Sequence, residues 1–365
     1  MEDLTGTAGP QEELTAVLAE IGRILPGGAS RPGDLPTLGE LAAHLPESST
    51  AVYLVPGAEA ADGQALLWEV VMAHLLQSVG TARGGGSGTA DWILVPVGHL
   101  SMLPVHAAGT PEEWLDDRVV VRVLPSLTQL APPPVAPASG VPLVATSSAA
   151  DLPFLPADRA VAEHLLPSAP GPGAVVRART REDALTGLTD ARSAVLGGHA
   201  RHSLRHGAGL DLDDGPLTAE HLWRLPVRDR DVAIVTGCSS AQVAGTLVDE
   251  VVGLPSALLR AGFRGVLATL WPVSDATAFI TLAHLLQLRR DGPDLAPHLV
   301  LHEVRRTLRT LTTRELRRWF TQLGSQLPVP PDTAARFEAF LSPYGGGATP
   351  LADPKDWAAF AYVGR

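Results

Sequence analysis

The chain contains a single cysteine, Cys238, at the end of an apolar run that is typical of a buried strand. A second apolar run, Ser193–Gly198, ends on His199. The carboxyl ends of neighbouring parallel strands meet at one edge of a sheet, so the two runs could bring a thiol beside an imidazole. That pair would supply a nucleophile and its general base. The alternative is that Cys238 is a small buried hydrophobic residue.

Strand and helix patterns alternate after a proline-rich linker, residues 131–140. The pattern predicts an α/β fold in which a mostly parallel sheet carries helices on both faces. Between His199 and Thr218 it predicts a loop. The predicted strands cover 141–146, 175–178, 194–197, 232–237, 265–270 and 358–363, and the predicted helices cover 157–166, 181–188, 218–225, 254–261 and 276–288.

The sequence divides into three predicted parts. Residues 1–47 form an N-terminal helical appendage, because helical periodicity there is interrupted by Gly and Pro. Residues 48–137 form an N-terminal α/β lobe with three short strands and a helix at 65–79. Residues 138–365 form the second lobe, which holds both Cys238 and His199.

Composition excludes several classes of function. The chain has 365 residues with 28 basic and 39 acidic side chains, a net charge of −11, and such a surface argues against nucleic acid or an anionic membrane as partner. One cysteine cannot form an intrachain disulfide or a zinc site of several thiolates. The start of the chain lacks the order of a signal peptide, so we expect a cytoplasmic protein. No cofactor or metal is expected. The arginine-rich stretch Arg305–Arg318 predicts a solvated helix face or a docking surface.

Seven blocks of the chain, in order, resemble the CHAT-domain cysteine peptidases of the caspase-like clan, which also includes caspases, separases and gingipains. The sequence around His199 resembles that family's histidine block, and Val-Thr-Gly-Cys-Ser-Ser-Ala resembles its cysteine block. The similar blocks are Ile93–Pro104, Leu124–Thr128, Val195–Ala200, Gly209–Thr218, Val235–Ala241, Gly253–Asp275 and Trp357–Gly364.

The resemblance implies a caspase-like fold and an endopeptidase with a Cys/His dyad. It implies that His199 takes the proton of Cys238 and that the backbone N–H groups of Ala200 and Cys238 hold the oxyanion. Members of the clan line their specificity pocket from the positions of Asp151, Trp271 and Asp275. Acidic side chains there would favour a basic residue before the scissile bond. The expected partners are a protein substrate and a regulatory protein in bacterial signalling or defence.

The sequence departs from the family pattern at two positions: Ala200 replaces the glycine after the histidine, and Gly237 replaces the alanine before the cysteine. These departures favour a rival hypothesis, an inactive pseudoprotease that serves as a binding scaffold. A hydrolase of thioesters or small amides would use the same dyad. His206 is an alternative base, and His199, His202 and His206 together are an alternative metal site. His99 and His106 are expected to be ordinary loop or packing residues.

Overall fold

The structure, a computed structural model, describes residues 49–54, 90–96, 104–110, 113–131, 135–138, 140–166, 175–203, 207–237, 240 and 253–365. All of these lie in the second of two compact units, residues 45–365. The predicted appendage 1–47 and the predicted helix 65–79 lie outside the described residues. Their assignment stays a prediction.

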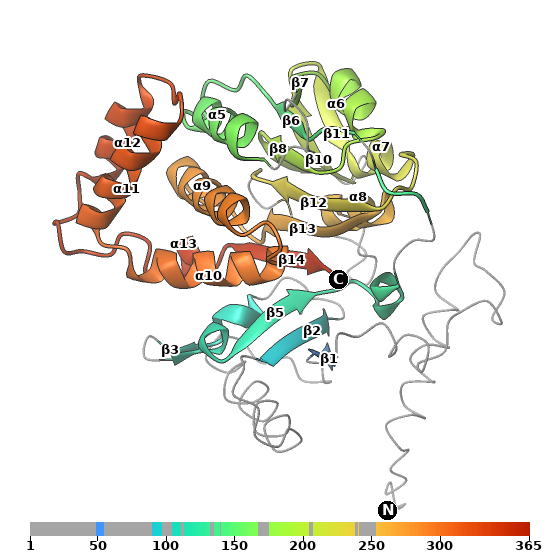
Figure 1. Cartoon of the computed structure of the whole chain (residues 1–365), viewed down its shortest axis with the longest axis horizontal. Helices are drawn as coiled ribbons and strands as arrows, with labels where there is room; N and C mark the ends of the chain where they lie inside the picture. Colours follow the sequence, from blue (N-terminus) through green and yellow to red (C-terminus); the bar gives the residue numbers. More distant parts are fainter. Residues whose placement is uncertain are drawn as a thin grey trace, which may run out of the picture. The chain divides into compact units, whose positions relative to one another are not determined.

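Nine of the described strands form one sheet with two parallel blocks (Figure 1). Strands β1, β2, β5 and β14 run parallel to one another, and β13, β12, β8, β6 and β7 form the second parallel block. The blocks join where β14 pairs antiparallel with β13. The carboxyl ends of the two blocks therefore lie at opposite edges. In sheet order the strands are β1 Ser49–Leu54, β2 Ala90–Pro96, β5 Val119–Val123, β14 Phe360–Gly364, β13 Phe263–Thr269, β12 Arg230–Val235, β8 Ala194–Gly197, β6 Leu143–Thr146 and β7 Val176–Ala178.

Successive residues of the second block pack into different cores, as expected for a sheet buried on both faces. Val144, Val195 and Ile234 belong to one cluster of buried side chains, whereas Ala145, Leu196 and Val235 belong to the other. This alternation explains why the strands are continuous apolar runs in the sequence. The α/β architecture with a mostly parallel sheet is thus confirmed.

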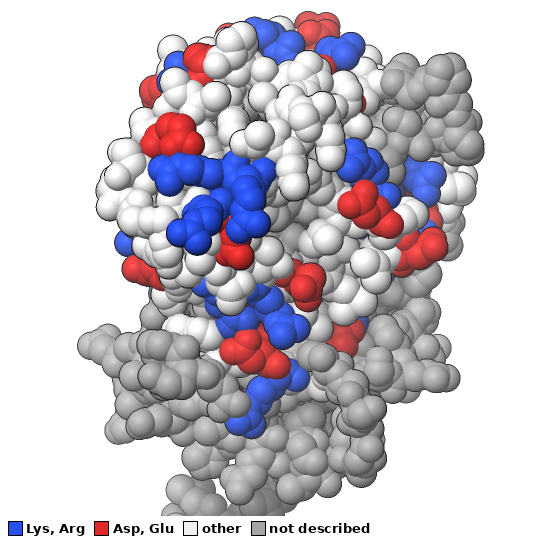
Figure 2. Space-filling view, turned by 60° about the vertical axis from the view of Figure 1, so that its left-hand side comes forward, with Lys and Arg blue, Asp and Glu red and all other residues white. Residues whose placement is uncertain are grey.

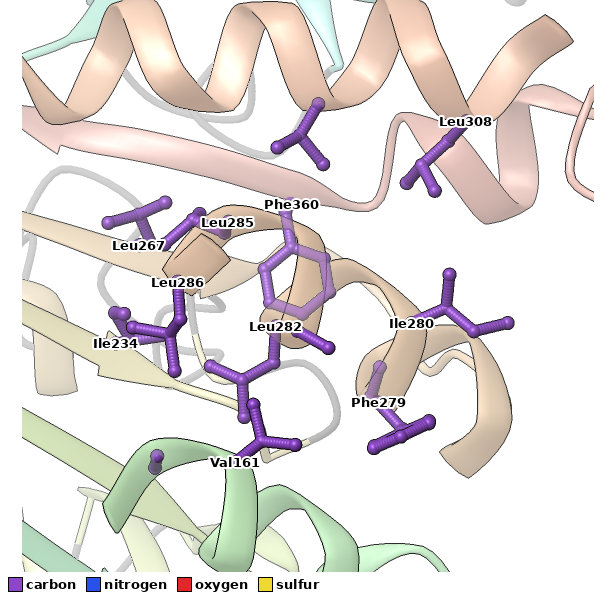
Figure 3. Close-up of a cluster of buried hydrophobic side chains, with 14 of the residues drawn as sticks. Val161, Ile234, Leu267, Phe279, Ile280, Leu282, Leu285, Leu286, Leu308 and Phe360 are labelled. Carbon is purple, nitrogen blue, oxygen red and sulfur yellow. The ribbon is translucent and has the colours of Figure 1, made fainter. Parts of the chain in front are cut away.

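Helices cover both faces. Figure 3 shows Val161 of α5, Leu282 of α9 and Ile234 of β12 converging in the first core. Residues of α6, α7 and α8 pack into the second core. The helices are α5 Leu155–Leu165, α6 Arg181–Leu188, α7 Ala219–Trp223, α8 Leu254–Arg260, α9 Asp275–Asp291, α10 Pro297–Thr310, α11 Thr313–Gln326, α12 Thr333–Leu341 and α13 Pro354–Trp357, with short 3₁₀ turns η3 Val105–Ala107, η4 Leu115–Asp117 and η5 Leu127–Leu130.

The segment after His199 is a small sheet rather than the predicted loop. Strands β9 Ala200–Ser203, β10 Gly207–Leu212 and β11 Gly215–Thr218 pair antiparallel in the order β11-β10-β9. The prediction was wrong because only β10 alternates apolar and polar residues, and it does so over three positions, Leu210 to Leu212. A turn at Asp213 and Asp214 joins β10 to β11, and Gly215, the first residue of β11, has a φ of +125° that favours glycine. A further two-stranded sheet pairs β3 Gly109–Thr110 with β4 Glu113–Trp114.

The arginine-rich stretch of α10 is partly buried. Arg305 is 1% exposed and pairs with the buried Asp116 at 3.2 Å. The expectation of a solvated face or docking surface is wrong for Arg305, because it shares the inward helix stripe with Leu301 and Leu308. The partly buried Arg309 and the exposed Arg317 are also paired with acidic residues, and Figure 2 shows basic side chains beside acidic ones on this side of the molecule.

Buried histidines should make folding stability depend on pH. Burial lowers the pKa of His106 to about 3 and that of His284 to about 4. The folded state holds these rings neutral, so unfolding takes up protons below about pH 6.5. These two histidines therefore cost no stability above that pH, and the free energy of unfolding falls as the pH drops towards 4. We expect a loss of about 2 kcal/mol per histidine between pH 7 and pH 5.

Urea unfolding of the chain and of its His284→Gln variant at both pH values measures this effect. The pH-dependent loss should be smaller by about 2 kcal/mol in the variant, because one titrating ring has been removed. The other groups are common to both proteins and cancel. Equal losses would show that His284 is not held neutral in the folded state.

No described helix is both long enough and apolar enough to span a membrane.

Candidate active site

Four adjacent strands of the second block, β13, β12, β8 and β6, direct their carboxyl ends to one edge of the sheet. Trp271 follows β13, Gly237 follows β12, His199 follows β8 and Asp151 follows β6. The fold therefore collects at one edge the segments that carry the sequence-predicted site residues. Cys238 itself lies outside the described residues.

His199 lies between the end of β8 and the start of β9. The backbone N–H of Asp211 on β10 donates to the His199 carbonyl at 2.8 Å, which anchors the residue to the small sheet. Gly198 precedes it with a φ of +157°, and a Cβ there would lie 2.6 Å from the Asp211 carbonyl oxygen. Only glycine fits such a close approach without a shift of the backbone.

The imidazole of His199 contacts Asp151, with Nε2 2.9 Å from Oδ1. The His199 side chain is 38% exposed and that of Asp151 is 74% exposed, so the pair faces solvent. The hydrogen bond from His199 holds the pKa of Asp151 below its ordinary value. The sequence suggested Asp151 only as a pocket residue, but its carboxylate is hydrogen-bonded to the imidazole of the predicted base. The residues are far apart in the sequence, so no local pattern predicts this contact.

Gly237 packs directly against the loop that carries His199. A Cβ built on Gly237 would lie 2.9 Å from the Gly198 carbonyl oxygen and 3.2 Å from the Ala200 Cβ. It would also lie 2.6 Å from a methyl group of Leu210. The residue before Cys238 is therefore in contact with both neighbours of His199, and it must be small.

Ala200 opens β9 opposite Leu210 of β10. The neighbouring pair His199 and Asp211 is hydrogen-bonded, so Ala200 and Leu210 form a non-hydrogen-bonded pair. The N–H of Ala200 consequently points away from β10, on the outer edge of the three-stranded sheet. Ala200 is a strand residue, and the backbone conformation that favours glycine falls two residues earlier, at Gly198.

The other two predicted pocket residues lie at the same edge. Trp271 donates from Nε1 to the Lys355 carbonyl at 2.8 Å, which ties it to α13. Asp275 begins α9 and accepts a hydrogen bond from the Phe154 backbone N–H. Burial raises the pKa of Asp275 and outweighs the opposing effect of that hydrogen bond. The charges of His199 and Asp151 also act on Asp275, so these three ionisable groups share one region.

Asp158 is an acidic residue of this region that the sequence did not single out. It lies in the first turn of α5, is 2% exposed, and its Oδ1 has no hydrogen-bond partner among the described residues. Burial and the nearby charge of Asp275 raise its pKa well above the ordinary value. The sequence could have indicated its burial, because Asp158 is three residues from both Leu155 and Val161 and so lies on the apolar face of the predicted helix.

The burial of Asp158 predicts that Asp158→Asn stabilises the fold at neutral pH. The raised pKa means that the folded state resists ionisation while the unfolded chain ionises above about pH 3.8. The cost grows as the pH rises from that value and is absent below it. We expect a gain of about 1 to 3 kcal/mol at pH 7 that disappears near pH 3.5. Urea unfolding at the two pH values tests this, and a gain of equal size at both would contradict it.

A family model named "CHAT domain" matches residues 63–365. The chain belongs to the CHAT-domain family. A comparison with curated protein sequences gave no match.

Solved structures similar to this CHAT domain include chains of two separase–securin complexes and of a gingipain complex. A chain of the Saccharomyces cerevisiae separase–securin complex at 2.6 Å is 14% identical over 81% of the chain, with a TM-score of 0.45. A second structure of that complex, at 3.0 Å, is 17% identical over 59% of the chain, with a TM-score of 0.42. The complex of the pro- and mature domains of Porphyromonas gingivalis RgpB is 13% identical over 60%, with a TM-score of 0.41. The matches span 17%, 14% and 59% of those chains, respectively.

The two departures from the CHAT pattern lie side by side. Ala200 carries a methyl group and Gly237 lacks one, in place of the glycine and the alanine that the sequence resemblance implies at these positions. A Cβ on Gly237 would meet the Ala200 Cβ at 3.2 Å, so this contact contains one methyl group, that of Ala200.

The remaining histidines divide by position. His106 is buried, and its Nε2–H donates to the Ala358 carbonyl at 2.8 Å, which confirms a packing role. His99, His206 and the side chain of His202 lie outside the described residues, so the alternative base and the alternative metal site stay predictions.

Proposed function

We propose that the chain is a cysteine endopeptidase that cuts a specific protein partner, with Cys238 as nucleophile and His199 as general base. The observation that carries the proposal is the packing of Gly237 against Gly198 and Ala200. The chain immediately before the thiol touches the residues on both sides of the imidazole. Cys238 is the next residue after Gly237, which supports a position within reach of the His199 imidazole.

The contact between His199 and Asp151 supports a defined role for the ring. When the Nε2–H donates to Asp151, the lone pair of Nδ1 remains available as a proton acceptor. Nδ1 takes the proton of Cys238, and the thiolate attacks the carbonyl carbon of the scissile peptide bond. Protonated His199 then gives that proton to the leaving amine, and a thioester remains. Water hydrolyses the thioester and restores the thiol.

The oxyanion formed in the attack needs hydrogen-bond donors. The N–H of Ala200 points away from β10 at the edge of the small sheet, which supports its use as one donor. The N–H of Cys238 would be the second. An alanine serves here as well as a glycine because the residue is in a strand.

The acidic groups at this edge favour a substrate with a basic residue before the scissile bond. Asp275 is a partly buried carboxyl group whose pKa burial raises. A guanidinium or ammonium group would compensate its charge in a partly desolvated site. Trp271, fixed by its bond to Lys355, would line the same pocket.

Profiling with a peptide library tests the activity and the preference together. The chain should cleave after Arg or Lys, and Asp275→Asn should lower kcat/KM for these peptides about 10- to 100-fold while keeping the acceptor for the Phe154 N–H. Glu220→Gln removes an exposed carboxylate on α7 and should leave the rate unchanged. A preference for acidic residues before the scissile bond would reject the proposed role of Asp275 in the pocket. The absence of any cleavage would reject the proposed peptidase activity.

The rival scaffold hypothesis drew its support from Ala200 and Gly237. Because these two residues are in contact, we interpret the two departures as one paired substitution rather than as the loss of a functional site. We further propose that residues 1–47 dock a regulatory protein, that 48–137 form the N-terminal lobe and that 138–365 form the catalytic lobe. Bacterial signalling or defence is the setting that we propose for the protein substrate.

A further inference from the structure

A buried hydroxyl of β13 is bonded to the two described residues that border Cys238 and Ser239 in the sequence. Thr269 is fully buried, and its Oγ1–H donates to the Gly237 carbonyl at 2.7 Å. The same Oγ1 accepts from the Ser240 backbone N–H at 3.2 Å. A hydrogen bond of 3.2 Å from the Ser240 N–H to the Gly237 carbonyl closes the turn between them.

Ser240 makes the matching contacts in the opposite direction. It is also fully buried, its Oγ–H donates to the Val235 carbonyl at 3.3 Å, and its Oγ accepts from the Thr269 backbone N–H at 3.0 Å. Each hydroxyl therefore bonds the backbone of the other residue's segment, and each is satisfied as donor and acceptor. We call Thr269 and Ser240 the hydroxyl clamp.

The hydroxyl clamp lies just beyond the point where the backbone pairing of β12 with β13 ends. The last paired residues of β12 and β13 are Ile234 and Leu267. Beyond them, Thr269 pairs with Phe360 of β14 on its other side, and its hydroxyl contacts Gly237 and Ser240. Side-chain bonds here hold the end of β12 to β13 in place of a backbone ladder.

We propose that Thr269 and Ser240 are positioning residues of the peptidase site, which hold Gly237 and Ser240, the described residues on either side of Cys238 and Ser239, in place relative to the His199 loop. This proposal rests on the proposed function. Gly237 is held from one side by Thr269 and touches the His199 loop on the other, so its position sets the spacing between the two reacting groups. A displacement of about 1 Å at such a site can cost about 100-fold in rate.

The test measures the alkylation rate of Cys238 by iodoacetamide as a function of pH, together with kcat and KM on a cleaved peptide. Every label falls on Cys238 because the chain has no other cysteine. Thr269→Val keeps the shape but removes the hydroxyl, and should lower the rate at pH 7 and kcat by about 10-fold or more, with KM little changed. The midpoint of the pH profile should move towards that of a free thiol, about 8.5.

Three further variants separate positioning from general destabilisation. Thr269→Ser keeps the hydroxyl and should stay within about 3-fold of the unmodified chain. Thr281→Val removes a buried hydroxyl of α9 that donates to the Thr277 carbonyl, and should leave both the labelling and kcat unchanged. Ser240→Ala should match Thr269→Val, and the double variant should be no worse than either one, because the two hydroxyls act as a unit.

Two results overturn the proposal. One is that Thr269→Val behaves like Thr281→Val in labelling and kcat, and the other is that the effects of Thr269→Val and Ser240→Ala multiply in the double variant. Failure of the proposed function has a different signature, which is seen without any clamp variant: the unmodified chain cleaves no peptide, and His199→Ala leaves the alkylation profile unchanged.

Discussion

Cys238→Ala should abolish peptide cleavage, with kcat/KM lower by about three orders of magnitude or more. The methyl group of alanine cannot attack a carbonyl carbon, and the chain has no second cysteine to replace the thiol. The thermal unfolding temperature should stay close to that of the unmodified chain. Initial rates on a peptide selected from the library, with circular dichroism for folding, measure both quantities.

Two companion variants make that result specific. Ser239→Ala changes the next residue and should cleave at the normal rate. His199→Ala should lose nearly as much activity as Cys238→Ala, and the double variant should lose little more, because nucleophile and base act as a unit. Cleavage by Cys238→Ala at an undiminished rate would reject the assignment of the nucleophile.

Gly237→Ala should lower kcat/KM by about 100-fold. Its new methyl group would lie 2.9 Å from the Gly198 carbonyl oxygen and 3.2 Å from the Ala200 Cβ, so the turn before Cys238 must move away from the His199 loop. Ala200→Gly alone should change the rate only a few-fold, because it removes a methyl group without forcing a shift. The rates are measured on the same peptide as above.

The double variant with Gly237→Ala and Ala200→Gly restores the family pattern and is the informative comparison. It should recover a few-fold of the activity lost by Gly237→Ala, since removal of the Ala200 methyl group relieves the 3.2 Å contact but not the closer ones with Leu210 and the Gly198 carbonyl oxygen. Independent effects, with the double variant as poor as the product of the single ones, would show that the two departures are unrelated. The scaffold hypothesis would then regain its support.

The second parallel block could be predicted from the sequence because each of its strands is buried on both faces. Helix α6 and strand β8 have the predicted bounds, and α5, α8 and α9 differ by a few residues at their ends. The strands of the small sheet were missed because β9 is short and polar, and β11 is short and begins with Gly and Pro. Their pairing depends on contacts with β10 rather than on a local pattern.

The candidate site could also be predicted only in part from the sequence. Placement of His199, Asp151, Trp271 and Asp275 near one edge follows from where strands end, which an apolar run reveals. The bond between His199 and Asp151 and the burial of Asp158 depend on how loops and helices pack across the sheet. Sequence spacing carries no information on such contacts, so they emerge only from the structure.

Alkylation of Cys238 in the unmodified chain and in His199→Ala tests the pairing of thiol and imidazole most directly, because it needs no substrate. Iodoacetamide reacts with the thiolate, so a paired cysteine is labelled at pH values where a free thiol is largely protonated. We predict rapid labelling at pH 6 to 7 in the unmodified chain and at least about 10-fold slower labelling in His199→Ala. Identical pH profiles for the two proteins would contradict the account.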